Sequence, residues 1–133
     1  MRRVILIDVN NNVSVESYDS ILSVENYVSP HWGLTYEIPI KNIPATDGVF
    51  YLMTDDALGA CETDEEVFAL HNDVASKLMC KDVYGNCAVV KMTAYDPDTY
   101  VDDALSHGED TDWVDIKDDD IKYILRMAGK SEI

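Results

Sequence analysis

Hydrophobic residues near the start of the chain form two short strands separated by a polar turn. Val4–Ile7 is a continuous apolar run, and Val13 and Val15 then alternate with polar neighbours. The intervening Asp8–Asn12 is rich in asparagine, which tolerates the positive φ angles of a tight turn. The pattern therefore predicts a β-hairpin at the N-terminus.

The hydrophobic period changes to that of a helix at two places further on. The first helix follows a capping residue, Asp19 or Ser20, and is stopped by Pro30. The second opens at Thr63, which is expected to form a capping box with Glu66 three residues later. The buried faces predicted for these helices are, in order, Ile21, Val24 and Val28, and then Val67, Leu70, Val74 and Leu78.

A third helix is predicted at the C-terminus, where Asp118–Asp120 place negative charge at its first turn and Gly129 offers a C-cap. Its predicted apolar face consists of Ile121, Ile124, Leu125 and Ala128.

Three further segments have the pattern of strands. Leu34–Ile40 alternates between apolar and polar residues, and Pro39 within it indicates an edge position. Val49–Met53 and Cys87–Met92 are apolar runs typical of buried strands. The predicted order ββαββαβ, followed by the last helix, indicates an α+β fold with a mostly antiparallel sheet of about five strands. We expect a single domain, 1–133, made of a core, 1–94, and an acidic C-terminal extension, 95–133.

The charge of the chain departs from that of an ordinary globular domain. Its 133 residues include 26 acidic and 10 basic side chains, a formal net charge of −16, while hydrophobic residues make up 47%. That hydrophobic content is enough for a packed core. The negative charge repels nucleic acid and anionic membranes and attracts basic surfaces, so direct binding to either is not expected.

The cysteines and the N-terminus indicate a soluble protein of the cytoplasm. Cys61, Cys80 and Cys87 have no paired spacing, which argues against a disulfide scaffold. The first apolar run ends at Asp8, too early for a signal sequence or a membrane span.

Residues 95–133 carry half of the net charge, with 12 acids and 4 bases. A calcium loop of the EF-hand type does not fit this region. Counted from Asp96, Tyr100, Val101 and His107 occupy the places of an oxygen ligand, the glycine and the final glutamate. A magnesium site stays open, and its candidate ligands are Asp102, Asp103, Asp110 and Asp112. Zinc is disfavoured because no CxxC pair occurs. Scattered aspartates are more often solvated surface than a magnesium site. We therefore expect no metal and no other cofactor.

The histidines do not lie in a catalytic signature. His31 is expected in a loop, and His71 in boundary packing on the second helix beside Leu70. His107 is expected in a turn amid carboxylates, which favour its charged form. The chain also lacks a P-loop and a dinucleotide fingerprint. We therefore expect no catalytic residues, and a small metal-dependent or thiol enzyme is the second alternative.

The acidic segment also contains large aromatic rings, which suggests a surface that imitates a polyanion. DNA carries about one negative charge per 1.7 Å of its axis, so dense exposed carboxylates can occupy the same basic surface. Exposed rings would supply anchors. The competing interpretation is that Trp113 and Val114 pack against the sheet and the aspartates merely solvate a connection. The predicted partner-binding residues are Asp96, Asp98, Tyr100, Asp102, Asp103, Glu109, Asp110, Asp112, Trp113 and Asp115.

Three stretches carry a resemblance: RRVILIDVNNNVSVESY, YLMTDDALG and HNDVASKLMCKDVYGNCAVV. Over Arg2–Val90 they are similar to a small domain family of unknown function found in bacteriophage and mobile-element proteins. Asn72 and Gly85 match the punctuation of that family, whereas Cys87 and the acidic tail do not. The family brings no catalytic residues. The resemblance implies a phage or mobile-element accessory protein, and in charge and size the chain is similar to anti-CRISPR and anti-restriction inhibitors.

The sequence thus favours a non-enzymatic inhibitor in the cytoplasm of an infected bacterium. Its expected partner is a positively charged host protein such as a CRISPR effector or restriction nuclease, bound at the basic surface that holds nucleic acid. The alternative is a small acidic accessory module whose charge serves only solubility.

Overall fold

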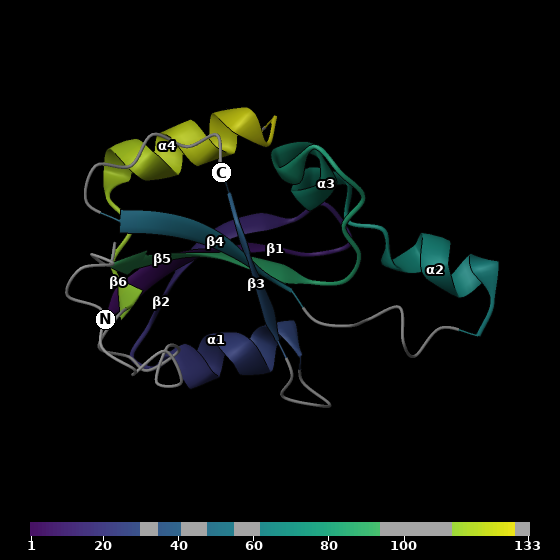
Figure 1. Cartoon of the computed structure of the whole chain (residues 1–133), viewed down its shortest axis with the longest axis horizontal. Coiled ribbons are helices and arrows are strands. Elements are labelled where there is room, and N and C mark those ends of the chain that lie inside the picture. The colour runs from purple at the N-terminus through teal and green to yellow at the C-terminus, as the bar shows by residue number, and fades with distance from the viewer. Residues whose placement is uncertain (30–34, 41–47, 55–61, 94–112, 130–133) are drawn as a thin grey trace, which may run out of the picture.

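The computed structural model describes residues 1–29, 35–40, 48–54, 62–93 and 113–129 (Figure 1). The described residues form six strands and four helices. The strands are β1 (Arg2–Ile7), β2 (Val13–Tyr18), β3 (Tyr36–Pro39), β4 (Gly48–Thr54), β5 (Cys87–Thr93) and β6 (Trp113–Val114). The helices are α1 (Ile21–Val28), α2 (Asp64–Leu70), α3 (Asp73–Met79) and α4 (Asp118–Met127).

The strands form one antiparallel sheet in the order β2-β1-β5-β4-β3, so the predicted α+β class is confirmed. β6 was not predicted, since two residues are too few to show a pattern. It pairs with Lys91 and Met92 of β5, whereas β1 pairs with Cys87–Val89. Because β4 occupies the other edge of β5, β1 and β6 share one edge end to end.

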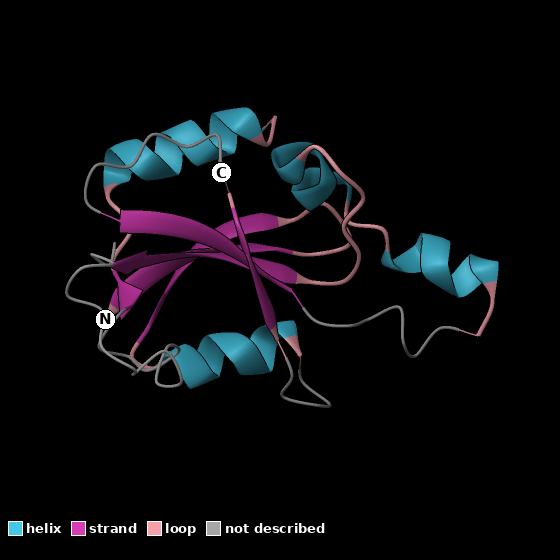
Figure 2. Cartoon of the chain, viewed as in Figure 1, coloured by secondary structure: helices cyan, strands magenta, loops and turns pink. Residues whose placement is uncertain are grey.

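Helices cover both faces of the sheet (Figure 2). On one face α3 and α4 pack over a core that includes Ile5, Phe50 and Val89. On the other face α1 packs over a core that includes Val4 and Val90. Neighbouring strand residues therefore serve opposite layers, as the two-residue period of a strand requires.

Several local predictions are confirmed. Asn11 adopts a positive φ of 67° in the first hairpin turn. Ser20 caps α1 by accepting a hydrogen bond from the backbone N–H of Leu22. Pro39 lies on β3, an edge strand, and Gly129 follows α4 with a φ of 81°.

The second predicted helix is wrong in one respect, because it breaks into α2 and α3 at His71 and Asn72. Asn72 is fully buried, and its amide nitrogen donates to the carbonyls of Ile7 and Gly85 at 3.0 and 2.9 Å. Its side-chain oxygen caps α3 by accepting from the N–H of Ala75 at 3.0 Å. These bonds fix Asn72 outside a helix, a competition typical of asparagine.

The break changes what the predicted stripe does. Val74 and Leu78 of α3 are buried as expected, whereas Val67 and Leu70 of α2 are not. None of the residues of α2 is buried, and the helix stands away from the sheet (Figure 1). The predicted capping box is also altered: Thr63 accepts from the N–H of Glu66, but the Glu66 carboxylate accepts from the N–H of Glu62.

Part of the predicted acidic extension packs into the core. Trp113 belongs to the layer beneath α1, and Ile116, Ile124 and Leu125 belong to the layer beneath α3 and α4. The described residues 113–129 therefore share the hydrophobic core of the first 94.

Candidate functional site

Eight of the ten predicted partner-binding residues lie outside the described residues, so their role stays a prediction. The structure does place the described residues on either side of the segment that carries them. Met92 of β5 pairs with Trp113 of β6, so the strands that flank residues 94–112 in the sequence are neighbours in the sheet. The eight are Asp96, Asp98, Tyr100, Asp102, Asp103, Glu109, Asp110 and Asp112.

Trp113 lies inside the protein. Its side chain is 1% exposed and packs with Val90 and Met92 beneath α1. The guanidinium carbon of Arg2 lies 5.1 Å from the centroid of the Trp113 ring, a cation–π geometry. The expectation of an exposed aromatic anchor at this position is therefore wrong, because the ring fills the core next to its own strand.

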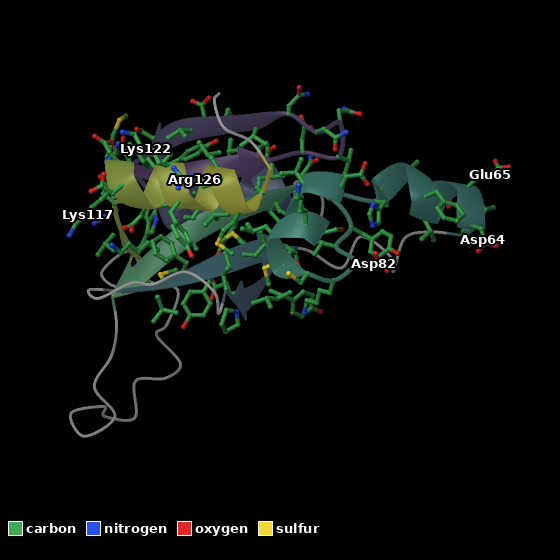
Figure 3. All side chains as sticks on the ribbon, turned by 90° about the horizontal axis from the view of Figure 1, so that it is seen from above. Asp64, Glu65, Asp82, Lys117, Lys122 and Arg126 are labelled. Carbon is green, nitrogen blue, oxygen red and sulfur yellow. The ribbon has the colours of Figure 1, made fainter. Side chains whose placement is uncertain are left out.

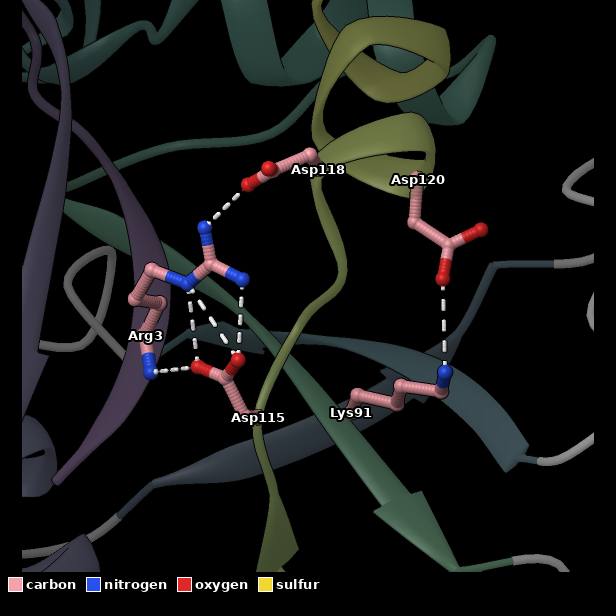
Figure 4. Close-up of polar contacts among 5 residues, drawn as sticks. All are labelled: Arg3, Lys91, Asp115, Asp118 and Asp120. Atoms are coloured by element: carbon pink, nitrogen blue, oxygen red, sulfur yellow. Dashed lines mark hydrogen bonds and ion pairs between the residues drawn. The ribbon is translucent and has the colours of Figure 1, made fainter.

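Asp115 is bound to the first strand of the sheet (Figure 4). Its carboxylate accepts from the backbone N–H of Arg3 at 2.6 Å and from the Arg3 guanidinium at 2.9 Å. A second nitrogen of the same guanidinium donates to Asp118. The bonds from Arg3 lower the pKa of Asp115 below its usual value, and the two carboxylates raise the pKa of Arg3.

A second cation binds the start of α4 from within the core. Lys91 is 1% exposed, and its ammonium nitrogen lies 3.3 Å from an oxygen of Asp120 and 5.4 Å from the centroid of the Phe50 ring (Figure 4). Gly48 leaves room for the Lys91 side chain, since a β-carbon at position 48 would lie 2.8 Å from a carbon of that side chain. A buried ammonium requires such a partner.

Arg3, Lys91, Asp115, Asp118 and Asp120 thus form a junction that attaches β6 and α4 to the sheet. The favourable interaction of acids with a helix N-terminus accounts only in part for Asp118–Asp120. Arg3 and Lys91 of the sheet also bind two of these three side chains. The sequence contained a signal for one pair. Lys91 lies on the same face of β5 as the buried Cys87 and Val89, because side chains alternate between the two faces of a strand. A lysine on a buried face needs an acidic partner.

A second cluster surrounds His71 at the break between α2 and α3. Nδ1 of His71 lies 2.6 Å from an Asp73 oxygen, and Nε2 lies 3.2 Å from an Asp82 oxygen and 3.3 Å from Oγ of Ser76. The ring also meets Tyr84 edge-on, with centroids 5.3 Å apart. The hydrogen bond to Asp73, and then that to Asp82, raise the pKa of His71 above its usual 6.5.

Ser76, His71 and Asp73 have the order of a hydrolytic triad, but their surroundings differ from one. A triad histidine must accept the serine proton at Nε2. Here Asp82 lies at that nitrogen and stabilises the charged ring. Ser76 Oγ instead accepts from the backbone N–H of Val83 at 2.8 Å. The cluster is therefore built as an ionic clamp on the helix break, rather than the boundary packing expected for His71.

The cysteines of the described part have structural positions. Cys87 is buried in β5 and Cys80 ends α3 with a φ of 57°. Among the described residues, no group of three or more His, Cys, Asp or Glu side chains is placed to hold a metal ion. The possible magnesium ligands lie outside those residues. No described helix has the length and apolar character needed to cross a membrane.

α2, with the acidic Asp64 and Glu65, lies at the opposite end of the molecule from Lys117, the residue that precedes α4 (Figure 3). Its first turn holds Asp64, Glu65 and Glu66, and the side chain of Phe68 is 77% exposed. Sequence analysis assigned Phe68 no role. The available signal was that this aromatic residue lies outside the predicted apolar face, which contains Val67 and Leu70, and so was to be expected at the surface.

Comparison with known proteins returned no match, whether to a family model, to a curated protein or to a solved structure.

Proposed function

We propose that the protein is a non-enzymatic inhibitor that binds the basic nucleic-acid-binding surface of another protein. One observation carries the proposal. Residues 94–112 contain seven acids and no Lys or Arg, and the strands on either side of this segment pair with each other, Met92 with Trp113.

We infer that this segment, joined to the sheet at two neighbouring positions, acts as one concentrated negative charge. The Debye length at physiological salt is about 8 Å, so carboxylates reinforce one another only when they are held close together. A concentrated charge of this kind accelerates association with a basic surface and competes with DNA for it. The junction supports this arrangement, because Arg3 and Lys91 hold the strand and helix that follow the segment.

The resemblance to phage and mobile-element domains favours a host defence nuclease, such as a CRISPR effector or a restriction nuclease, as the target. The site of action would then be the cytoplasm of an infected bacterium. Such enzymes hold nucleic acid in positively charged channels.

The alternative function is an accessory module in which acidity serves only solubility. It is favoured by the junction, where Asp115, Asp118 and Asp120 act within the fold. The two functions differ in what the acids of residues 94–112 do.

The test measures affinity for purified CRISPR effector and restriction nucleases across a salt series from about 50 to 300 mM. We expect affinity to fall steeply with salt and to be lost when double-stranded DNA saturates the nuclease. Replacing Asp102, Asp103 and Asp110 with Asn should weaken binding at least tenfold, on the order of the loss expected from removing three steering charges.

The matched control makes the same charge change elsewhere, with Glu16→Gln, Asp19→Asn and Asp119→Asn on exposed positions. We expect the control to retain nearly all of the affinity. Retained affinity in the variant of residues 102, 103 and 110 would favour the alternative in which acidity serves only solubility. An equal loss of affinity in the variant and the control, or binding undisturbed by saturating DNA, would overturn the proposal.

A further inference from the structure

Phe68 projects from α2 between acidic side chains. Asp64 and Glu65 precede it by four and three residues, so all three lie on the same side of the helix. We call Asp64, Glu65 and Phe68 the α2 patch. With its side chain 77% exposed, Phe68 is more exposed than the other large hydrophobic residues of the described helices and strands.

The fold does not explain this ring. A helix of seven residues is too short to be stable by itself, and helices normally gain stability by burying an apolar face. α2 buries none of its residues, so Phe68 adds nothing to the core. Single exposed hydrophobic residues are common on protein surfaces. Phe68 differs from them because it lies on a helix that stands away from the sheet and buries none of its residues (Figure 1).

The patch is held at a fixed position by the residues that follow it. The carbonyl of Leu70 accepts from the N–H of Gly85 at 2.7 Å, and the N–H of Asn72 donates to the carbonyl of Val83 at 2.8 Å. The His71 clamp lies between these two bonds. Fixing a contact element before binding reduces the entropy lost on association.

The charge around the patch determines the kind of partner. The sequence has no Lys or Arg between Lys41 and Lys77, and Glu62 and Glu66 add to the charge of Asp64 and Glu65. We propose that the α2 patch docks on a protein surface that has an apolar pocket bordered by Lys or Arg. Phe68 enters the pocket, and the two acids pair with its rim, the usual division between anchor and rim.

The inference rests on the proposed function, because both assign a basic partner. It adds that binding has an apolar anchor as well as a charge term, and that the anchor is Phe68 rather than Trp113.

The test uses the full chain and two synthetic peptides with the same number of lysines. One peptide has leucines spaced to form an amphipathic helix, and the other has serines at those positions. We expect the wild type to bind the leucine peptide about tenfold more tightly, a gain typical of one well-placed apolar anchor. Phe68→Ala should remove this preference and leave the affinity for the serine peptide unchanged.

Leu22→Ala is the matched control, since Leu22 is also an exposed apolar residue on a helix, at 60% exposure on α1. It should keep the preference. Asp64→Asn combined with Glu65→Gln should weaken binding to both peptides. An unfolding curve of each variant that matches the wild type confirms that the fold is intact.

Failure of the inference differs from failure of the proposed function. Equal affinities for the two peptides, or a preference that survives Phe68→Ala, would overturn the role of the α2 patch while leaving a charge-driven partner in place. Absence of binding to either peptide at low salt would count against the basic partner itself and so against both proposals. Concentration-dependent dimerisation of the free protein that Phe68→Ala abolishes would assign the patch to a second copy of the chain and overturn the proposal.

Discussion

α2 and α4 begin with the same kind of sequence and end with different roles. Each has three acids in its first turn, Asp64–Glu66 in α2 and Asp118–Asp120 in α4. In α4, Arg3 and Lys91 reach from the sheet to two of these acids, and Ile124 and Leu125 are buried. In α2, no residue is buried and the aromatic side chain points outward.

The difference shows that an acidic first turn does not by itself indicate function. A helix dipole favours acids at either N-terminus by the same modest amount. What separates the two helices is the sheet beneath α4, which presents a buried ammonium and a guanidinium. Asp118 and Asp120 of α4 therefore bind cations of the sheet, whereas no cation among the described residues is paired with Asp64 or Glu65 of α2.

The largest expected effect separates the two aromatic residues. Trp113→Ala should lower the free energy of unfolding by about 4 kcal/mol, because it leaves a cavity beneath α1. Phe68→Ala should change that free energy by less than about 0.5 kcal/mol, since the ring is exposed. Urea unfolding followed by circular dichroism measures both. A similar loss in the two variants would contradict the assignment of one ring to the core and the other to the surface.

The next effect tests the buried ion pair. Asp120→Asn removes the charge of a carboxylate that binds the buried ammonium of Lys91 and should cost about 3 kcal/mol of unfolding free energy. Adding Lys91→Met should recover most of that loss, since an apolar side chain of similar length replaces the buried ammonium. Asp64→Asn on α2 is the control and should cost well under about 1 kcal/mol. If Asp120→Asn proves as mild as the control, the junction does not stabilise the fold.

A smaller effect should appear at acidic pH. The guanidinium of Arg3 holds the pKa of Asp115 below the usual value of 3.8. A lowered pKa in the folded state contributes stability above the unfolded value, and that contribution is lost as the pH falls through the folded value. Stability should therefore decline below about pH 4, and the decline should be shallower in Asp115→Asn. An unchanged acid limb in the variant would exclude Asp115 as a contributor.

Whether a helix or strand could be predicted from the sequence depends on the range of the interactions that determine it. The first hairpin, α1 and α4 were predicted correctly because their determinants, such as Asn11, Ser20 and Gly129, are local. The break between α2 and α3 could not be predicted, since Asn72 bonds to Ile7 and Gly85, which are distant along the chain.

The candidate site was predictable to a lesser degree. Trp113 reads as an exposed ring among acids until its pairing with Met92 places it in the core. Lys91 stands alone within the apolar run of β5 and could have been predicted as a buried cation, but its partner Asp120 lies 29 residues away. Sequence patterns report which face of an element is apolar, and they do not report which distant element will cover that face.

The smallest predicted effect is a loss of stability at the base of α2 as the pH rises, whereas the effect of Asp115 is a loss of stability as the pH falls. Asp73 and Asp82 raise the pKa of His71 above 6.5. A raised pKa gives stability that is fully present below 6.5 and is lost as the pH rises through the folded value. Hydrogen exchange at Leu70–Asn72 should therefore become faster above neutral pH, after correction for intrinsic exchange. His71→Gln should remove this dependence, and a persistent dependence in that variant would exclude the clamp.

The central claim is that the acids of residues 94–112 serve a partner while those of the junction serve the fold. Its most direct test is the affinity of a defence nuclease for the wild type and for the Asp102, Asp103 and Asp110 to Asn variant, each with its unfolding free energy measured alongside. We expect this variant to lose at least tenfold in affinity, the order expected for three steering charges, with no loss of stability. Unchanged affinity in a folded variant would contradict it.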